Sequence, residues 1–140
     1  MRLADFGLAK FVGKGMDNSP YVAIYYYRKE GGLTRGHQYA LAWWVPECID
    51  DGDGDAVFSV ASDVYSFGVL MWQCFSGRDP FDDVWDESLH SKNPCQMIVD
   101  KILNGERPSL KRLKNSTPIE LISLITQCWT EDPRERPTMD

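Results

Sequence analysis

The sequence has no uninterrupted apolar run long enough to cross a membrane. Its longest apolar stretch extends from Phe67 to Phe75 and is broken by Gly68 and Gln73, whereas a bilayer span needs roughly 20 apolar residues. We also expect no secretory signal within this segment, because residues 1–4 lead directly into Asp5. We therefore expect no membrane contact from this segment, and a cytoplasmic location or a place in the cytoplasmic domain of a larger protein.

Paired cysteines are absent as well. The four cysteines, Cys48, Cys74, Cys95 and Cys128, are widely separated, and none belongs to a Cys-x-x-Cys pair or has a histidine at metal-ligand spacing. This pattern argues against a zinc site. It predicts buried, reduced thiols in an intracellular protein.

The sequence has no excess of positive charge. Fifteen Lys and Arg residues stand against 21 Asp and Glu residues, which gives a net charge of −6. A nucleic acid or an anionic membrane is bound by a clustered basic face. The balance therefore predicts no nucleic acid partner.

What the chain does have is enough apolar and aromatic material for one core. Hydrophobic residues make up 43% of its 140 positions, with five Trp, six Tyr and six Phe. This composition argues against disorder. It predicts one domain, or one lobe of a larger domain.

Two segments have clear helix boundaries. The first is predicted to begin with Ser62 as its cap and to end at Gly77, with apolar residues covering most of its circumference. A helix that is apolar all round is expected to be buried on every side. The second helix is predicted over residues 94–104, with Gly105 as the stop.

A third helix is predicted to follow Pro118, and the fold class is therefore mainly α. Its apolar residues recur at helical spacing and mark a core face: Leu121, Leu124, Ile125, Cys128 and Trp129. Residues 8–42 and 51–55 lack such a period and are predicted to be loops. Only short extended pieces, such as residues 1–7, are expected elsewhere.

Several motifs follow one another in a fixed order, and the order is more specific than any of them alone. They are Asp5-Phe6-Gly7, Trp43-Trp44-Val45-Pro46-Glu47, the run from Ala61 to Leu70, Gln127-Cys128-Trp129, and the stretch from Asp132 to Pro137. Together they resemble a eukaryotic protein kinase domain of the tyrosine kinase or tyrosine-kinase-like group. An isolated Asp-Phe-Gly would more simply be a turn.

The resemblance implies a definite part of that domain. Residues 1–140 would form a partial kinase domain, with 1–47 as the activation segment and 48–140 as the helical C-terminal lobe. The expected fold is mainly α and kinase-like from the activation segment onward. The N-terminal lobe and the catalytic loop are lacking in this sequence.

For the chemistry, the resemblance places the cofactor-binding residues at the start of the chain. Asp5 would bind the metal ion, Phe6 would pack to set its position, and Gly7 would permit the backbone turn. ATP and Mg²⁺ are expected only in the complete domain. No catalytic residue is expected in this chain, because the Asp of the catalytic loop is not in it.

Three charged residues have structural roles by the same resemblance. Glu47 would form a buried ion pair with Arg136, although both residue types are usually exposed. Asp63 stands where kinases have the Asp that hydrogen-bonds the catalytic loop. An Asp near a helix N-terminus is also simply a favourable partner for the helix dipole.

The loop between these motifs contains candidate phosphorylation sites. Tyr25, Tyr26 and Tyr27 precede Arg28 and Lys29, as in the autophosphorylation stretch of insulin-receptor-like kinases. A phosphate could order the loop by pairing with nearby basic residues. The alternative is a tyrosine-rich loop that is packed or exposed.

The acceptor hydroxyl is left open by departures from the family pattern. Residues 40–42 replace the Pro-Val-Lys or Pro-Val-Arg of tyrosine kinases, and the Gly-Thr of many serine/threonine kinases is also missing. The complete domain is expected to transfer the γ-phosphoryl of ATP to a Tyr, Ser or Thr hydroxyl of a protein substrate. Its partners would include the missing N-terminal lobe and catalytic loop. The alternative is a non-catalytic kinase remnant that acts as a protein-binding module.

Overall fold

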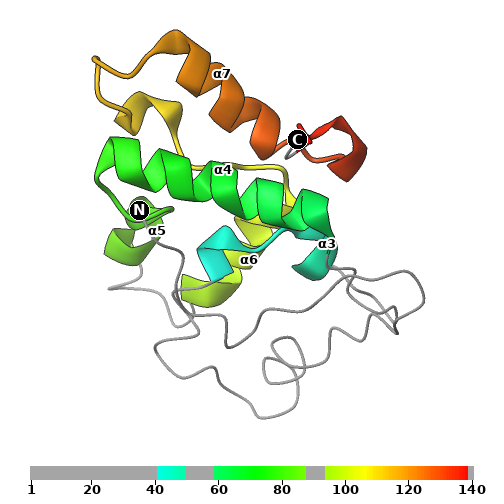
Figure 1. Ribbon diagram of the computed structural model, residues 1–140. Coiled ribbons are helices and arrows are strands. Elements are labelled where there is room, and N and C mark those ends of the chain that lie inside the picture. Colours follow the sequence, from blue (N-terminus) through cyan, green and yellow to red (C-terminus); the bar gives the residue numbers. More distant parts are fainter. Residues whose placement is uncertain (1–40, 50–58, 88–93, 139–140) are drawn as a thin grey trace, which may run out of the picture.

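Helix α4 (Val60–Ser76) runs through the middle of the described part of the chain, with α7 on one side and shorter elements on the other (Figure 1). The computed structural model describes residues 41–49, 59–87 and 94–138. The remaining elements are η1 (Leu41–Trp43), α3 (Pro46–Ile49), α5 (Asp82–Glu87), α6 (Pro94–Leu103), η3 (Leu110–Arg112), α7 (Ile119–Cys128) and η4 (Pro133–Glu135). No strand occurs within these residues, and the predicted mainly α class is confirmed.

The start of α4 corrects the predicted cap. Ser59, not Ser62, is the N-cap, and its hydroxyl accepts a hydrogen bond from the Ser62 backbone N–H at 3.3 Å. The Ser59 N–H in turn donates to the Ser62 Oγ at 3.1 Å. The two serines therefore form a reciprocal capping box one turn before the position predicted. At the other end, Gly77 adopts φ 70°, so the predicted left-handed stop is confirmed.

The prediction that α4 is buried on every side is wrong for one stripe of the helix. Val64, Tyr65, Val69 and Trp72 are almost completely covered. Five other residues recur at three- and four-residue spacing on the outward side and are exposed: Val60, Asp63, Phe67, Leu70 and Cys74. Phe67, for example, keeps 39% of its surface exposed. The apolar residues around α4 are typical of a core helix, but those on the outward stripe are exposed to solvent in this structure.

Helices α4 and α7 approach each other closely at one glycine. A Cβ placed on Gly68 would lie 2.7 Å from the Cβ of Cys128 and 3.4 Å from the carbonyl oxygen of Ile125. The two helices can therefore meet at this distance only because position 68 has no side chain. Cys128 and Ile125 belong to the same core cluster as Val69 and Trp72.

A second group of buried side chains lies on the other side of α4. Ile98 and Ile102 of α6 pack there with Phe81, Val84 and Ala42. Pro94 begins α6, and Gly105, at φ 77°, follows its end. The predicted helix over residues 94–104 is thus confirmed to within one residue.

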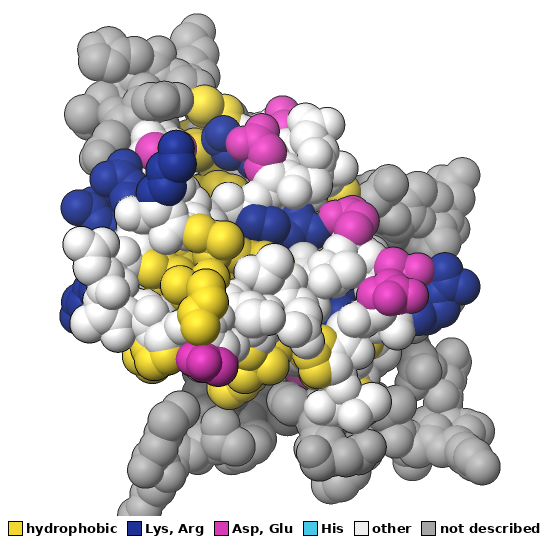
Figure 2. Space-filling model, turned by 90° about the horizontal axis from the view of Figure 1, so that it is seen from above, with side chains coloured by type: hydrophobic (Ala, Val, Ile, Leu, Met, Phe, Trp, Pro, Cys, Tyr) yellow, Lys and Arg dark blue, Asp and Glu magenta, His cyan; other side chains and the backbone are white. Residues whose placement is uncertain are grey.

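Helix α7 buries only part of its predicted core face. Ile125, Cys128 and Trp129 are buried, and Leu121 is half-buried. Leu124 is 39% exposed, which corrects its predicted place in the core. From the side of α7, Figure 2 shows hydrophobic side chains gathered at the surface between Lys and Arg side chains.

Two of the three described cysteines match the expectation of buried thiols. Cys95 and Cys128 are buried, and desolvation raises the pKa of both thiols. Cys74 is exposed on the outward stripe of α4, so the expectation was wrong there. Among the described residues, no helix is both long and apolar enough to cross a membrane.

We expect Gly68→Ala to destabilise the chain by about 1–2 kcal/mol. Overpacking against the Cβ of Cys128 costs about 1–3 kcal/mol, and the better helix propensity of Ala returns at most about 1 kcal/mol. Urea unfolding followed by circular dichroism measures the difference.

The matched control is Cys74→Ala, on the same helix but on its exposed stripe. Its effect on the free energy of unfolding should stay within about 0.5 kcal/mol. Equal effects of the two substitutions would contradict the close packing of α4 on α7.

Candidate functional site

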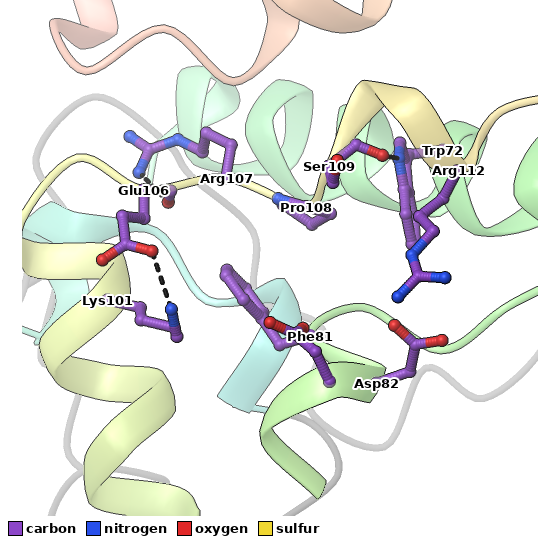
Figure 3. A pocket seen from close by; sticks show the side chains of 10 residues that line it. Trp72, Phe81, Asp82, Lys101, Glu106, Arg107, Pro108, Ser109 and Arg112 are labelled. Carbon is purple, nitrogen blue, oxygen red and sulfur yellow. Dashed lines mark hydrogen bonds and ion pairs between the residues drawn. The ribbon is translucent and has the colours of Figure 1, made fainter. Parts of the chain in front are cut away.

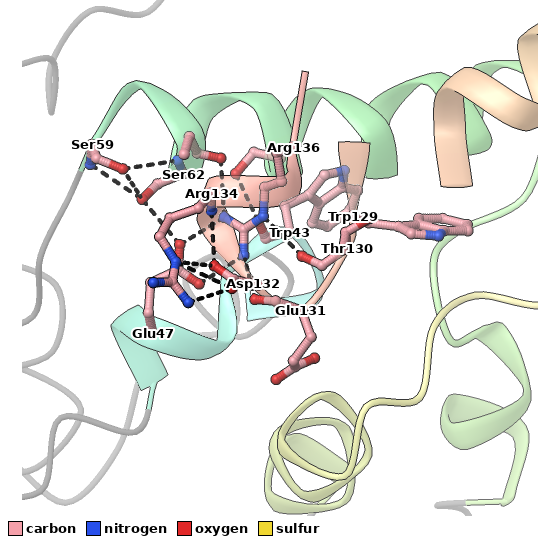
Figure 4. A network of polar contacts seen from close by, with 12 residues as sticks. Trp43, Glu47, Ser59, Ser62, Trp129, Thr130, Glu131, Asp132, Arg134 and Arg136 are labelled. Atoms are coloured by element: carbon pink, nitrogen blue, oxygen red, sulfur yellow. Dashed lines mark hydrogen bonds and ion pairs between the residues drawn. The ribbon is translucent and has the colours of Figure 1, made fainter. Parts of the chain in front are cut away.

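The described part of the candidate site centres on the side chain of Arg136. This residue directly follows η4, a single turn that begins at Pro133. The carboxylate of Asp132 accepts a hydrogen bond from the Arg134 backbone N–H at 2.9 Å and so caps the turn. The turn directs Arg136 toward α3 and the first turn of α4, where Figure 4 shows it.

Arg136 and Glu47 form a two-pronged ion pair. Nη1 of Arg136 donates to Oε1 of Glu47 at 2.6 Å, and Nη2 donates to Oε2 at 2.9 Å. The side chain of Arg136 is fully covered, whereas that of Glu47 keeps 24% of its surface exposed. Such a forked contact is both stronger and more directional than a single hydrogen bond.

The remaining donors of Arg136 bind backbone carbonyls. Nε donates to Thr130 O at 2.9 Å, Nη1 to Ala61 O at 3.0 Å, and Nη2 to Glu131 O at 3.1 Å. A guanidinium has five N–H donors, and all five are therefore used. One side chain thus joins α3, the first turn of α4 and the segment that follows α7.

A buried tyrosine lies beside this cation. The guanidinium carbons of Arg136 and Arg107 lie 5.0 Å and 5.1 Å from the ring centroid of Tyr65. Both distances are in the range of cation–π contacts. Burial raises the pKa of Tyr65 to about 12, although the positive charges of Arg107 and Arg136 act in the opposite direction.

Of the other residues predicted for the site, only Asp63 is among those that the structure describes, and it is not part of this cluster. Asp63 lies in the first turn of α4, is exposed, and its carboxylate has no partner among the described residues. Asp5, Phe6, Gly7 and the three tyrosines at 25–27 lie outside the described residues. Within the described part, no group of three or more His, Cys, Asp or Glu residues could hold a metal ion.

Sequence reasoning missed Arg107 and the role of Tyr65. Tyr65 was part of a recognised motif but was not singled out, and Arg107 lies in an unremarkable stretch after α6. The sequence offers no signal that two arginines far apart in the chain contact one ring. Only the folded chain brings them together.

A pocket of about 320 Å³ lies between α5, α6 and residues 106–112 (Figure 3). Trp72 forms part of its wall and donates from Nε1 to Ser109 O at 3.1 Å. Lys101 and Glu106 at its edge form an ion pair at 2.8 Å. Of the predicted site residues that the structure describes, none lines this pocket.

Comparison with known families decides how these features are understood. A family model described as protein tyrosine and serine/threonine kinase matches residues 1–140, which is the whole chain. The chain belongs to the protein tyrosine and serine/threonine kinase family. The predicted resemblance to a kinase domain is therefore confirmed.

Individual relatives include kinases named for both kinds of acceptor. The chain is 30% identical to tyrosine-protein kinase HTK16 of Hydra vulgaris over 100% of its own length, and 36% identical to a fibroblast growth factor receptor of Ciona intestinalis over 98%. It is also 36% identical to receptor-interacting serine/threonine-protein kinase 3 of Rattus norvegicus over 98%. It spans 15%, 15% and 25% of the lengths of these kinases.

Within this kinase-family chain, we expect Glu47→Gln to lower the free energy of unfolding by about 3–5 kcal/mol, or to abolish cooperative unfolding. The substitution preserves the shape of the side chain but leaves the buried cation of Arg136 uncompensated. Urea denaturation provides the measurement. The same change at Glu106, in a surface ion pair with Lys101, should cost less than about 1 kcal/mol. Similar losses for both variants would contradict the importance assigned to the buried pair.

The raised pKa of Tyr65 predicts an alkaline loss of stability in this kinase-family chain. Well below pH 10, the ordinary pKa of a tyrosine, the phenol is neutral in both the folded and unfolded states. Between pH 10 and about 12 the unfolded state loses this proton while the folded state keeps it. The free energy of unfolding should therefore fall by up to about 1.4 kcal/mol per pH unit in this window.

Tyr65→Phe isolates this contribution, because it keeps the ring and removes the titrating hydroxyl. Urea unfolding at pH values from 8 to about 11.5 should show a shallower decline for this variant than for the unsubstituted chain. Parallel declines would show that Tyr65 does not titrate as described.

Proposed function

We propose that this chain is part of a protein kinase domain that, when complete, transfers the γ-phosphoryl of ATP to a hydroxyl of a protein substrate. Residues 1–47 would be its activation segment and residues 48–140 the helical part of its C-terminal lobe. The observation that carries the proposal is the family match over the whole chain. The chain spans only 15–25% of the relatives reported above, and the complete activity is assigned to a longer protein.

The arrangement of the motifs supports this assignment. Glu47 closes the proposed activation segment, and Arg136 lies in the C-terminal motif, 89 positions along the chain. Their forked ion pair brings the two motifs together. A chance match of short motifs would give no reason for these two side chains to meet.

The exposed stripe of α4 supports the idea that the domain continues beyond this chain. Phe67 and Leu70 are exposed, although the opposite side of the same helix is packed in the core. The carboxylate of Asp63, for which no partner is seen among the described residues, lies on the same side, by its spacing from Phe67. In the complete domain, these groups would be covered by the segment that carries the catalytic loop.

Two departures from the family pattern do not indicate decay of the fold. Val45, which replaces the usual Ala of Ala-Pro-Glu, is 3% exposed and packs in the core cluster around Tyr65. Ala42 is also buried, in the cluster around Ile98. Both replacements fit their surroundings, so neither is a sign that the packing of the family fold has been lost.

The proposed roles at the nucleotide rest on the chain's first motif. Asp5 would hold the magnesium ion, with Phe6 and Gly7 setting its position, and Tyr25, Tyr26 and Tyr27 are the proposed phosphorylation sites. Magnesium bound with ATP would neutralise charge on the phosphates. The acceptor is proposed as Tyr or Ser/Thr, since relatives named for both kinds match the chain.

We expect the 140-residue chain alone to show no phosphoryl transfer from radiolabelled ATP. A longer protein that contains this sequence together with the N-terminal lobe and catalytic loop should transfer phosphate to a mixed tyrosine- and serine-containing polymer.

In that protein, Asp5→Asn should lower the rate of phosphoryl transfer at least about a hundredfold, because a metal-binding carboxylate is lost. Asp83→Asn, on the exposed surface of α5, is the matched control and should change the rate less than about twofold.

Turnover by the short chain would contradict the proposal that it is only part of the domain. A longer protein that binds partners but transfers no phosphate would favour the protein-binding module. Equal activity of the Asp5→Asn and Asp83→Asn variants would contradict the proposed role of Asp5.

A further inference from the structure

Two arginines hold the same short segment after α7. Arg107 donates from Nε to Trp129 O at 2.9 Å, and Arg136 donates to Thr130 O at 2.9 Å and to Glu131 O at 3.1 Å. The three successive carbonyl groups at positions 129, 130 and 131 are therefore all bound by guanidinium donors.

Arg107 is itself fixed by several partners. Its Nη1 donates to Ile102 O at 3.2 Å and to Glu106 O at 2.8 Å, at the end of α6. Its Nη2 forms an ion pair with the carboxylate of Glu131, and only 12% of its side chain is exposed. A side chain with this many hydrogen bonds has little conformational freedom. It therefore also restricts the positions of the groups at Trp129 and Glu131 that it binds.

The charges around the shared ring of Tyr65 are balanced in pairs. Glu131 neutralises Arg107, and Glu47 neutralises Arg136. Both guanidinium groups lie close to the ring, so two cations are held near one another in a largely buried place. Removing Arg107 would leave Glu131 without its partner and would release Trp129 O. It would also remove one of the two cation–π contacts to the Tyr65 ring.

We propose that Arg107 is a positioning residue for the Glu47–Arg136 ion pair, acting through the 129–131 segment and the ring of Tyr65. By holding Trp129 O and the Glu131 carboxylate, it places the carbonyls of Thr130 and Glu131 where Arg136 needs them. Arg136 then presents its fork to Glu47 in one orientation. Any effect of this positioning on catalysis rests on the proposed function. The positioning of Arg136 by Arg107 involves only residues of this chain and does not depend on that function.

Hydrogen exchange of the Arg136 Nε–H tests the proposal directly, because this donor binds Thr130 O. In the full chain labelled with ¹⁵N, the Nε–H signal is assigned with the help of Arg136→Lys and its exchange rate is measured by NMR. Arg107→Gln should speed this exchange at least about tenfold. Arg107→Lys, which keeps the charge but loses the fork, should give an intermediate rate.

The matched control is Arg112→Gln, the same substitution five positions along the chain. Arg112 is exposed, and no ion pair or side-chain hydrogen bond to it is seen among the described residues. This variant should change the Arg136 Nε–H exchange rate less than about twofold. An equal acceleration in the Arg107→Gln and Arg112→Gln variants would overturn the proposal.

The backbone amide of Val69, in the middle of α4, separates positioning from a general loss of stability. If Arg107 had a purely structural role, Arg107→Gln would speed the exchange of this amide and of the Arg136 Nε–H by the same factor. That result would also overturn the proposal.

If Arg107→Gln fails to fold, Glu131→Gln replaces it, because that change removes only the partner carboxylate on the surface. It should speed exchange at Arg136 about threefold while the Val69 amide stays unchanged. No phosphoryl transfer is measured, so failure here is distinct from failure of the proposed function.

Discussion

The described structure depends on one buried cation, the guanidinium of Arg136. A charge removed from water is tolerated only when it is neutralised and all of its donors are bound. The carboxylate of Glu47 supplies the neutralising negative charge. The carbonyl groups of Ala61, Thr130 and Glu131 supply the remaining hydrogen-bond acceptors. Because these groups come from α3, α4 and the segment after α7, satisfying Arg136 fixes how three parts of the chain meet.

The helices could be predicted where the local signals were strong. Gly77 and Gly105 end helices in left-handed conformations that favour glycine, and both stops were found in the sequence. The start of α4 was misplaced because two serines three positions apart are equally good caps, and only the reciprocal bonds between Ser59 and Ser62 decide between them. The short helices α3 and α5 have too few residues to show a period.

Burial and side-chain partners were harder to predict than helices. The apolar circumference of α4 predicted complete burial, but such a pattern does not say whether the covering segment belongs to this chain, and Phe67 and Leu70 are exposed. The Glu47–Arg136 contact was expected only because the motifs resembled a family. Arg107 was missed because the sequence does not show that it meets Tyr65 and the 129–131 segment. The sequence around a charged residue does not identify the residue with which it will form an ion pair.

The central claim is that the Glu47–Arg136 contact joins the two ends of the described fold. A double-mutant cycle with Glu47→Gln and Arg136→Met, measured by urea unfolding of the full chain, tests it most directly. We predict a coupling free energy of at least about 2 kcal/mol between the two substitutions, as expected for a buried, forked ion pair. Additive effects, with a coupling below about 0.5 kcal/mol, would contradict the account.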